Sequence, residues 1–372
     1  MRMPQPQGLL SKSGDAGESS GLIQIRNEVV QAWNLDTSFS FLFREKSLQK
    51  MHWRILMNNA TLQARQKTMR HLINRRFFLA LSCAWIALTP TANAGEAPRV
   101  HHVFIISFDQ GNPDLIEKSD LPVFHQMVAE GAHTWEAYTI VPSLTLPSHT
   151  SMLTGVGVQK HQVLWNDYEP EKGVVKVPTI FSIAKEHGFV TAMFVGKEKF
   201  KHLAQPGTVD EFVWPQPEDD AKSVAKAFAA AVGQLKPNLC FIHFRDPDTA
   251  GHKYGAESPE KVQSLKDCDE ALKTIKEAIA AAGFLDDSVI ILTADHGSHD
   301  ALNKQGKMVG THGSADSVDV KIPWVAWGKT VKKDFTITSP VVQYDTAATA
   351  IWLLGIPVPD SFWGRPATSA FE

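Results

Sequence analysis

Aspartate and histidine residues occur in short segments that follow apolar runs of the sequence or, for one histidine, come just before such a run. They are Asp109, Asp248, His252, Asp295, His296 and His312. Each alone has an ordinary explanation, because Asp often caps helices and turns and an isolated His is usually a hydrogen-bonded surface or core residue. Together they supply three carboxylates and three imidazoles, which suit two divalent metal ions with mixed nitrogen and oxygen ligands. Zn2+ is the first expectation, with Mn2+ or Fe2+ as alternatives.

The segment Pro142–Gly155, PSLTLPSHTSMLTG, is rich in hydroxyl groups and carries no charge. A Ser- and Thr-rich turn before a helix usually supplies a helix cap, which is one interpretation. Two divalent ions against three carboxylates would leave a local charge of about +1, and such a site attracts anions. It also promotes the loss of a proton from a coordinated Ser or Thr hydroxyl. The second interpretation is therefore that one hydroxyl of this segment is a nucleophile.

Apolar runs that alternate with helical patterns must position these residues. Strands are expected at His102–Phe108, Phe189–Val195, Leu239–Phe244, Val289–Thr293 and Ile322–Trp327. Helices are expected at Leu121–Gly131, Ala221–Leu235, Pro259–Gly283 and Asp345–Gly355. Continuous apolar strands separated by helices predict an α/β fold with a mainly parallel central sheet sandwiched by helices. Such folds bind ligands outside the carboxyl ends of their strands, which is where all of these Asp and His residues except His312 are expected; His312 comes just before the strand at Ile322–Trp327.

The order of these motifs resembles the alkaline phosphatase superfamily, and most closely its nucleotide pyrophosphatase/phosphodiesterase branch. The matching segments are Asp109, Thr145-Leu-Pro-Ser-His149, Asp248–His252, Asp295-His296-Gly297 and Gly310-Thr-His312-Gly313. The resemblance spans nearly all of residues 95–372. It implies an alkaline phosphatase-like fold and a metal-dependent hydrolase that acts on a small-molecule phosphoester.

The resemblance also implies roles for individual residues. Thr145 would be the nucleophile and would form a phospho-threonine intermediate. One metal would be held by Asp109, Asp295, His296 and the Thr145 oxygen, and the other by Asp248, His252 and His312. Asn166 matches a family Asn that donates to a phosphoryl oxygen, with a loop cap as the open alternative. Ser148, Thr150 and Ser151 are then expected to cap the following helix, and His149 to orient the loop.

The substrate is less determined. Leu144 stands where the branch usually has Lys, and Ser148 replaces an Asn. Lys197, in Val195-Gly-Lys-Glu-Lys199, could hold the extra charge of a phosphomonoester, although charge runs usually form solvated loops and that interpretation is favoured. The favoured function is a phosphodiesterase or pyrophosphatase. The alternatives are a phosphomonoesterase or phosphonate hydrolase on the same metal pair, and a catalytically decayed binding protein.

The N-terminal part differs in composition from the rest. Residues 69–94 contain a basic head, an uncharged apolar run at 77–88 and a small-x-small triplet at 92–94, which is typical of a secretory signal peptide. Residues 75–79, Arg-Arg-Phe-Phe-Leu, also resemble a twin-arginine signal. Residues 1–68 are expected to be an over-extended translation or a disordered extension. The catalytic domain is then 95–372, and its expected location is the periplasm or the exterior.

The composition describes an ordinary globular protein. Of the 372 residues, 43% are hydrophobic and 21% charged, and the formal charge of -3 indicates no nucleic-acid partner. The apolar run at 77–88 is too short to span a membrane, so no transmembrane domain is expected. Cys240 and Cys268 are expected to be buried thiols, with one disulfide as the alternative. The sequence does not determine the oligomeric state.

Overall fold

The computed structural model describes residues 99–372, and its main element is an eight-stranded sheet. The strands are β1 (His102–Phe108), β2 (Ala132–Tyr138), β3 (Thr191–Val195), β4 (Glu211–Val213), β5 (Leu239–Phe244), β6 (Ser288–Ala294), β9 (Lys321–Gly328) and β10 (Phe335–Thr336). Their order is β10-β2-β9-β6-β1-β5-β3-β4. β1 is parallel to β5 and β6, whereas β9 is antiparallel to β2 and β6. The mainly parallel sheet is therefore confirmed.

The fully buried strands agree with the sequence prediction better than the short or partly exposed strands. β1 and β5 have the expected bounds, and β3, β6 and β9 differ from them by one or two residues. β2, β4 and β10 were not predicted, and β10 is only two residues long. Strands that are short or partly exposed lack the continuous apolar run that identifies a buried strand.

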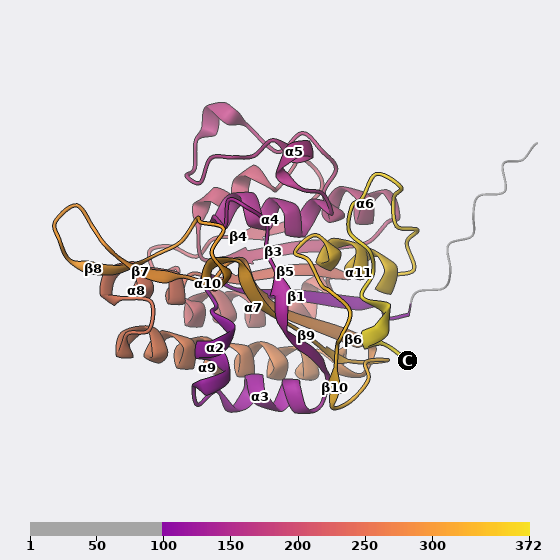
Figure 1. The fold of residues 1–372 in the computed structure, drawn as a ribbon. Helices are drawn as coiled ribbons and strands as arrows, with labels where there is room; N and C mark the ends of the chain where they lie inside the picture. Colours follow the sequence, from indigo (N-terminus) through magenta and orange to yellow (C-terminus); the bar gives the residue numbers. More distant parts are fainter. Residues whose placement is uncertain (1–98) are drawn as a thin grey trace, which may run out of the picture. The chain divides into compact units, whose positions relative to one another are not determined.

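Two layers of helices cover the sheet (Figure 1). One layer contains α2 (Pro113–Lys118), α3 (Pro122–Ala129), α7 (Ala221–Leu235) and α9 (Pro259–Ala281), and the other contains α4 (Thr145–Thr154), α6 (Ile180–Glu186) and α11 (Asp345–Leu353). The side chains of β1 alternate between the layers: Val103 and Ile105 lie in the core below α4, and Phe104 and Ile106 lie in the core with α7 and α9. This alternation buries both faces of the sheet.

Shorter elements connect the layers. The helices are α5 (Val158–His161), α8 (Asp246–Tyr254) and α10 (Ser317–Val320), with single turns η1 (Pro170–Lys172), η2 (Glu198–His202), η3 (Leu285–Asp287) and η4 (Thr368–Ala370). Between β6 and β9, the strands β7 (His299–Leu302) and β8 (Met308–Thr311) form a hairpin that projects from the body in Figure 1. The hairpin separates Asp295 and His296 in sequence from His312, yet returns the chain to the same edge of the sheet.

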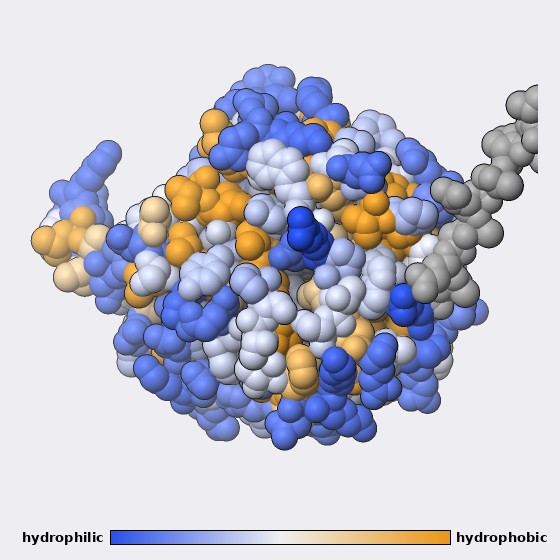
Figure 2. Space-filling model, turned by 45° about the vertical axis from the view of Figure 1, so that its right-hand side comes forward, coloured by the Kyte–Doolittle hydropathy of each residue, from blue (hydrophilic) through white to orange (hydrophobic). Residues whose placement is uncertain are grey.

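Three other expectations concern the N-terminal residues, the two cysteines and membrane-spanning helices. The proposed extension and signal peptide lie outside the described residues. Cys240 and Cys268 are both free and buried, so the thiol interpretation is confirmed. None of the described helices has the length and apolarity needed to cross a membrane. Figure 2 shows hydrophobic residues on one face in separate patches among hydrophilic ones.

A carboxylate from α9 holds the start of α3. The N-cap residue of α3, Leu121, provides no side-chain hydrogen bond. Instead, Asp269 accepts from the backbone N–H groups of Val123 at 3.1 Å and Phe124 at 2.7 Å. Asp269 is 4% exposed, so these bonds replace a local cap in a buried position.

We expect Asp269→Ala to lower the free energy of unfolding by about 1–2 kcal/mol, because two backbone donors lose their acceptor. Urea unfolding measures the change. Lys273→Ala, at an exposed position of the same helix, is the control and should have almost no effect. An equal effect of the two substitutions would contradict a capping role for Asp269.

Candidate active site

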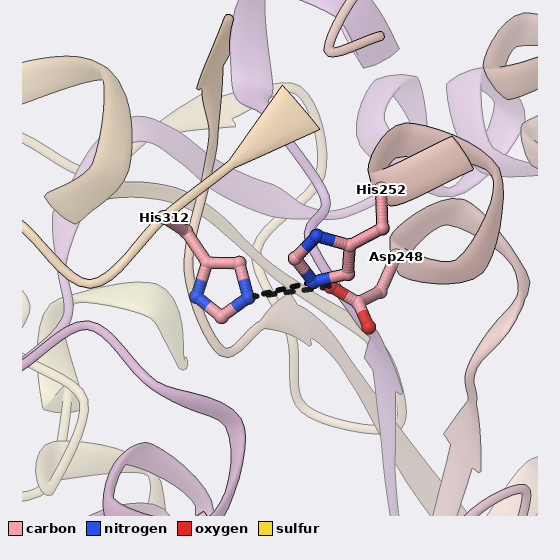
Figure 3. A group of neighbouring side chains, drawn as sticks. All are labelled: Asp248, His252 and His312. Atoms are coloured by element: carbon pink, nitrogen blue, oxygen red, sulfur yellow. Dashed lines mark hydrogen bonds and ion pairs between the residues drawn. The ribbon is translucent and has the colours of Figure 1, made fainter. Parts of the chain in front are cut away.

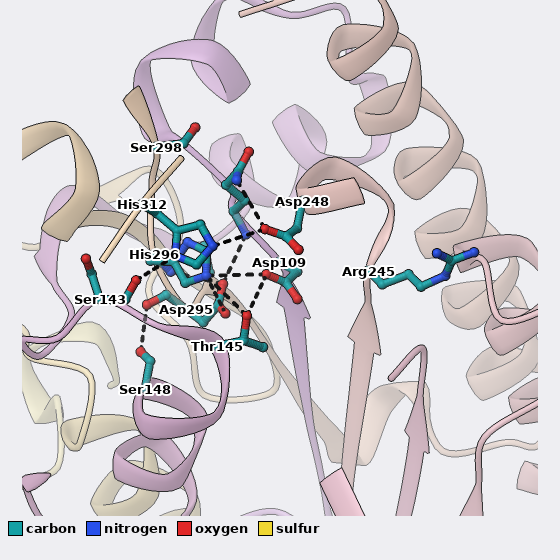
Figure 4. A network of polar contacts seen from close by, with 12 residues as sticks. Asp109, Ser143, Thr145, Ser148, Arg245, Asp248, Asp295, His296, Ser298 and His312 are labelled. Carbon is teal, nitrogen blue, oxygen red and sulfur yellow. Dashed lines mark hydrogen bonds and ion pairs between the residues drawn. The ribbon is translucent and has the colours of Figure 1, made fainter. Parts of the chain in front are cut away.

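The first group of candidate metal ligands lies at the ends of β1 and β6. The register of these strands pairs Phe108 with Ala294, so the next residues, Asp109 and Asp295, are neighbours. His296 Nε2 lies 3.2 Å from Asp295 Oδ2 and 3.5 Å from Asp109 Oδ1 (Figure 4). All three side chains are fully buried. We call Asp109, Asp295 and His296 the first triad.

The second group is Asp248, His252 and His312, here called the second triad (Figure 3). Asp248 and His252 are four residues apart on α8, a spacing that places both side chains on one face of a helix. His312 follows β8 and completes the group. Asp248 Oδ1 lies 3.1 Å from His252 Nε2 and 3.4 Å from His312 Nε2. The His252 side chain is 46% exposed, so this triad is open to solvent.

Backbone carbonyls orient all three histidines. Nδ1 of His296 bonds Gly297 O, Nδ1 of His252 bonds Gly310 O, and Nδ1 of His312 bonds Ser143 O, each at 2.9 Å. A carbonyl only accepts, so each Nδ1 carries the proton, and in the neutral ring Nε2 presents a lone pair. This arrangement is typical of metal-ligating histidines.

Two observations indicate that these residues fit metal ions. His252 Nε2 and His312 Nε2 face each other at 3.2 Å, where two lone pairs repel unless a cation or proton lies between them. In the first triad, Asp295 Oδ2 is buried and accepts no hydrogen bond among the described residues, although His296 Nε2 lies 3.2 Å from it. Each triad combines carboxylate oxygen with imidazole nitrogen, a donor set that suits Zn2+, Mn2+ or Fe2+.

The buried carboxylates make the first triad strongly favourable for positive charge. Burial by itself lowers the pKa of His296, but the carboxylates of Asp295 and Asp109 outweigh it and raise that pKa to about 9. Burial and the neighbouring His296 lower the pKa of His312. The field that retains a proton on His296 is the field that would attract a metal cation.

Thr145 is placed beside the first triad. It is the first residue of α4 and is 1% exposed. Its Oγ1 lies 3.5 Å from Asp109 Oδ1 and 3.4 Å from His296 Nε2 (Figure 4). A helix N-terminus carries partial positive charge, which stabilises an oxyanion at this position. The six candidate ligands and Thr145 are thus gathered at one edge of the sheet.

The expectation that Ser148, Thr150 and Ser151 cap a following helix is wrong. α4 begins at Thr145, so all three residues lie inside it. Ser148 donates to Asp295 O at 2.6 Å, Thr150 donates to Leu146 O at 2.6 Å, and Ser151 bonds His161 Nε2 at 2.9 Å. A buried helix needs partners for its hydroxyls, and these bonds supply them.

Asn166 and Lys197 also lie near the triads. Asn166 Oδ1 accepts from the N–H of Leu146 at 2.8 Å, which fixes the amide beside the start of α4. Lys197 Nζ lies 2.5 Å from Asp109 Oδ2 and 2.6 Å from Asp248 Oδ2, and its side chain is 16% exposed. The solvated-loop interpretation of Lys197 is therefore wrong. Burial opposes its charge, but the carboxylates of Asp109 and Asp248 raise its pKa.

The two carboxylates divide their oxygens between the triads and Lys197. Asp109 directs Oδ1 toward Thr145 and His296, and Asp248 directs Oδ1 toward His252 and His312. Their Oδ2 atoms contact Lys197. Lys197 thus links the triads while one oxygen of each carboxylate still faces its own group.

Sequence reasoning missed three residues around the site. His243, on β5, contacts Asp109 Oδ2 at 3.0 Å. Gln110 contacts carboxylates of both triads, and Lys261 contacts Gln110. His149, which was expected to orient the loop, donates to Thr145 O and accepts from Ser107 Oγ, and burial lowers its pKa to about 4. Of the three missed residues, only His243 could have been predicted from the sequence, because it is a polar residue near the end of an apolar strand.

Comparison with known proteins identifies similarity to one family of phosphodiesterases. The model of the family described as type I phosphodiesterase / nucleotide pyrophosphatase matches residues 103–332. Ectonucleotide pyrophosphatase/phosphodiesterase family member 7 of Mus musculus is 24% identical over 258 residues, which are 62% of this chain and 58% of that protein. The bis(5'-adenosyl)-triphosphatase enpp4 of Mus musculus is 24% identical over 222 residues, 54% of this chain and 47% of that protein.

Among solved structures, murine ectonucleotide pyrophosphatase/phosphodiesterase 5, an inactive variant in complex with AMP, aligns with a TM-score of 0.61. The alignment covers 73% of this chain and 100% of that chain at 15% identity, and it therefore shows the fold. The chain spans about half the length of the curated relatives it matches.

Zn2+ or Mn2+ added to chelator-treated protein is expected to raise the midpoint of thermal unfolding. An ion bound only by the folded state stabilises it by about 2.7 kcal/mol at about 100 times its Kd. Asp248→Asn removes one charge from the second triad and should reduce the shift. His187→Ala, at an exposed position far along the chain from the triads, is the control. A full shift in Asp248→Asn would mean that the ion binds elsewhere.

Proposed function

Since the chain belongs to the type I phosphodiesterase / nucleotide pyrophosphatase family of the alkaline phosphatase superfamily, we propose that it is a two-metal phosphoesterase that hydrolyses phosphodiester or pyrophosphate bonds through a phospho-threonine intermediate. The observation that carries the proposal is the placement of the Thr145 hydroxyl. It lies within 3.5 Å of Asp109 and His296, at the start of a helix and beside two groups of metal-ligand type.

The two triads would each hold one metal ion. Asp109, Asp295, His296 and the Thr145 oxygen would hold the first, and Asp248, His252 and His312 the second. Zn2+ is the first expectation, with Mn2+ or Fe2+ as alternatives. When bound, the ions would supply Lewis acidity, which lowers the pKa of the threonine hydroxyl and neutralises charge on the phosphoryl oxygens.

The chain's own residues then account for two displacements at phosphorus. In the first, Thr145 Oγ1 releases its proton to solvent and attacks, so that a bond from phosphorus to Oγ1 forms while the bond to the leaving oxygen breaks. The leaving oxygen takes a proton from solvent. In the second, the oxygen of a water molecule attacks phosphorus and the bond to Oγ1 breaks; the water gives up one proton, and Oγ1 takes up one proton, which restores the hydroxyl of Thr145. The N-terminus of α4 favours the negative charge on Oγ1 in both steps.

Asn166 is proposed to bind the phosphoryl group. Its Oδ1 is engaged by the N–H of Leu146, so the two N–H bonds of its Nδ2 are directed away from that contact. They can donate to an oxygen on phosphorus and hold it in line for attack. The loop-cap role and the substrate role of Asn166 are therefore compatible, since they use different atoms of one amide.

Apolar side chains near these segments support an organic ester as the substrate. Val141 and Leu164 are 51% and 58% exposed, four residues before Thr145 and two before Asn166 in sequence. The relative enpp4 is named for cleavage of a bis-adenosyl triphosphate, a pyrophosphate-linked nucleotide. We propose a substrate of the same general class, with an anionic phosphoryl group and an apolar or aromatic leaving group.

A second candidate function is a phosphomonoesterase or phosphonate hydrolase. The observation that favours it is Lys197, whose ammonium lies between the two triads rather than in solvent. A dianionic monoester gains more from a nearby cation than a monoanionic diester does. The third possibility, a decayed binding protein, is disfavoured because the six ligands and Thr145 occur together in one site.

We also propose that the protein is exported to the periplasm or secreted. The proposal rests on the signal-like residues 69–94, which lie outside the described residues. Relatives described as ectonucleotide pyrophosphatases carry a name that is consistent with export.

Thr145→Ala is expected to lower kcat for bis-p-nitrophenyl phosphate by at least about 10³-fold, because the nucleophile is lost, whereas Thr145→Ser keeps a hydroxyl and should retain more activity. Hydrolysis is measured on the full chain with added Zn2+ or Mn2+ and with a chelator control. Thr154→Ala, which removes an α4 hydroxyl bonded to Thr150 O, is the matched control. Metal-dependent hydrolysis at the wild-type rate in Thr145→Ala would refute the mechanism.

Lys197→Met separates the two candidate functions. If Lys197 binds substrate charge, the ratio of kcat/KM for p-nitrophenyl phosphate to that for the bis ester should fall about 10-fold, as for loss of one hydrogen bond to a charged group. Lys201→Met is the control, because Lys201 lies on the same segment and pairs with Glu198. An unchanged ratio, with both rates lowered together, would assign Lys197 to the metal site alone and favour the diesterase.

A further inference from the structure

A buried lysine lies behind the two triads. Lys261 is the third residue of α9 and its side chain has no exposed surface. Its ammonium donates to two uncharged side chains, Gln110 Oε1 and Ser298 Oγ, each at 2.8 Å. Ser298 is two residues after His296 of the first triad. A fully buried cation bonded to neutral groups is rare, because its desolvation is costly.

The pKa of Lys261 reflects the cost of removing its ammonium from water. Burial lowers the pKa of Lys261 to about 8, and the charges of Asp248, Asp109, Asp300 and Glu257 only partly oppose the effect. Apolar packing at this position would avoid the penalty altogether. We therefore expect the buried ammonium to perform a function that a neutral side chain at this position would not.

Gln110 links the two triads. Its backbone N–H donates to Asp295 Oδ1 of the first triad at 3.0 Å, and its side-chain Nε2 donates to Asp248 Oδ1 of the second at 3.1 Å. The backbone of Gln110 has a φ of 61°, in the left-handed region that non-glycine residues rarely adopt. Such a conformation is strained and persists where the surrounding contacts require it. Here it directs the N–H at Asp295.

The amide of Gln110 has two possible orientations, and Lys261 selects one of them. An ammonium can only donate, so it requires Oε1 on its side. The NH2 group then faces Asp248 and donates to its carboxylate. The opposite orientation would place Oε1 against the carboxylate oxygen and NH2 against the ammonium, and both contacts would be repulsive. A neutral, apolar residue at 261 would leave the orientation of the amide unspecified from this side.

We propose that Lys261 is a positioning residue that acts through Gln110, holding the carboxylates of the two triads in a fixed relation and so increasing the affinity for the metal pair. This inference rests on the proposed metal sites. Ser298 provides the second anchor of Lys261, on the segment that follows His296, so the ammonium is itself tied to the first triad.

Gly251, which lies against the side chain of Gln110, supports the proposed role of that amide. A Cβ atom at Gly251 would lie 1.9 Å from Gln110 Oε1, a distance that no real contact permits. Glycine in the segment DPDTAGH, between Asp248 and His252, therefore leaves room for the amide of Gln110 in its observed position. Gly251→Ala offers an independent way to displace the same amide.

The test measures metal affinity and not only activity. Full-length protein is stripped with a chelator, and Zn2+ binding is followed by competition with a chromophoric zinc chelator. Lys261→Met is expected to weaken binding of the weaker ion by at least about 10-fold, the usual range for residues that orient metal ligands. Lys261→Gln keeps an N–H donor and should lie between Lys261→Met and the wild type. Asp269→Asn, another buried polar position on α9, should leave Zn2+ affinity unchanged.

A double-substitution cycle tests whether Lys261 acts through Gln110. Gln110→Met should weaken Zn2+ binding, and the Lys261→Met/Gln110→Met protein should be no weaker than Gln110→Met alone. Additive losses would overturn the relay through Gln110. Wild-type affinity in Lys261→Met would overturn the role of Lys261 while leaving the metal sites intact. If Lys261→Met does not fold in urea-unfolding controls, Gly251→Ala replaces it, and unchanged affinity there overturns the inference. Absence of Zn2+ binding in the wild type would instead refute the proposed function.

Discussion

Electrostatic repulsion among three buried carboxylates is the constraint on which the site depends. Asp109 and Asp295 are fully buried at the ends of adjacent strands, and Asp248 is nearly so. Like charges in a region of low dielectric are strongly unfavourable unless cations lie among them. The chain supplies one such cation in Lys197, and it arranges three imidazoles so that each Nε2 faces the same region. The remaining negative charge favours the binding of cations among these side chains.

The sheet positions the residues of the first triad, whereas the contact between α8 and the β7–β8 hairpin positions those of the second. Parallel pairing of β1 with β6 fixes Asp109 beside Asp295, because the register leaves no freedom at the strand ends. The second triad instead depends on packing between α8 and β8. A Cβ at Gly310 would lie 2.7 Å from the carbonyl of Gly251, so the two backbones approach closely there. One triad is therefore held by the sheet and the other by a contact between surface elements, which leaves it more open to solvent.

The polar contacts around the two triads all restrict the movement of site residues. His243 and Lys197 engage the outer oxygen of Asp109, Gln110 joins Asp295 to Asp248, and His149 bonds the carbonyl of Thr145. Each contact restricts a group that would otherwise move when charge changes in the site. In the proposed mechanism, the hydroxyl of Thr145 would need little rearrangement to react, which is the physical basis of preorganisation.

The sequence alone determined the fold class, the buried strands and the set of residues with metal-ligand chemistry. Continuous apolar runs identify buried strands, and the residues that follow parallel strands must meet at one edge of the sheet. Only the tertiary structure decided the contacts of Lys197, Gln110 and Lys261, and the start of α4 at Thr145. A lysine in a charged run, or in the first turn of a long helix, has the pattern of a solvated side chain. Its burial depends on which distant segments pack over it, and local sequence does not encode that contact.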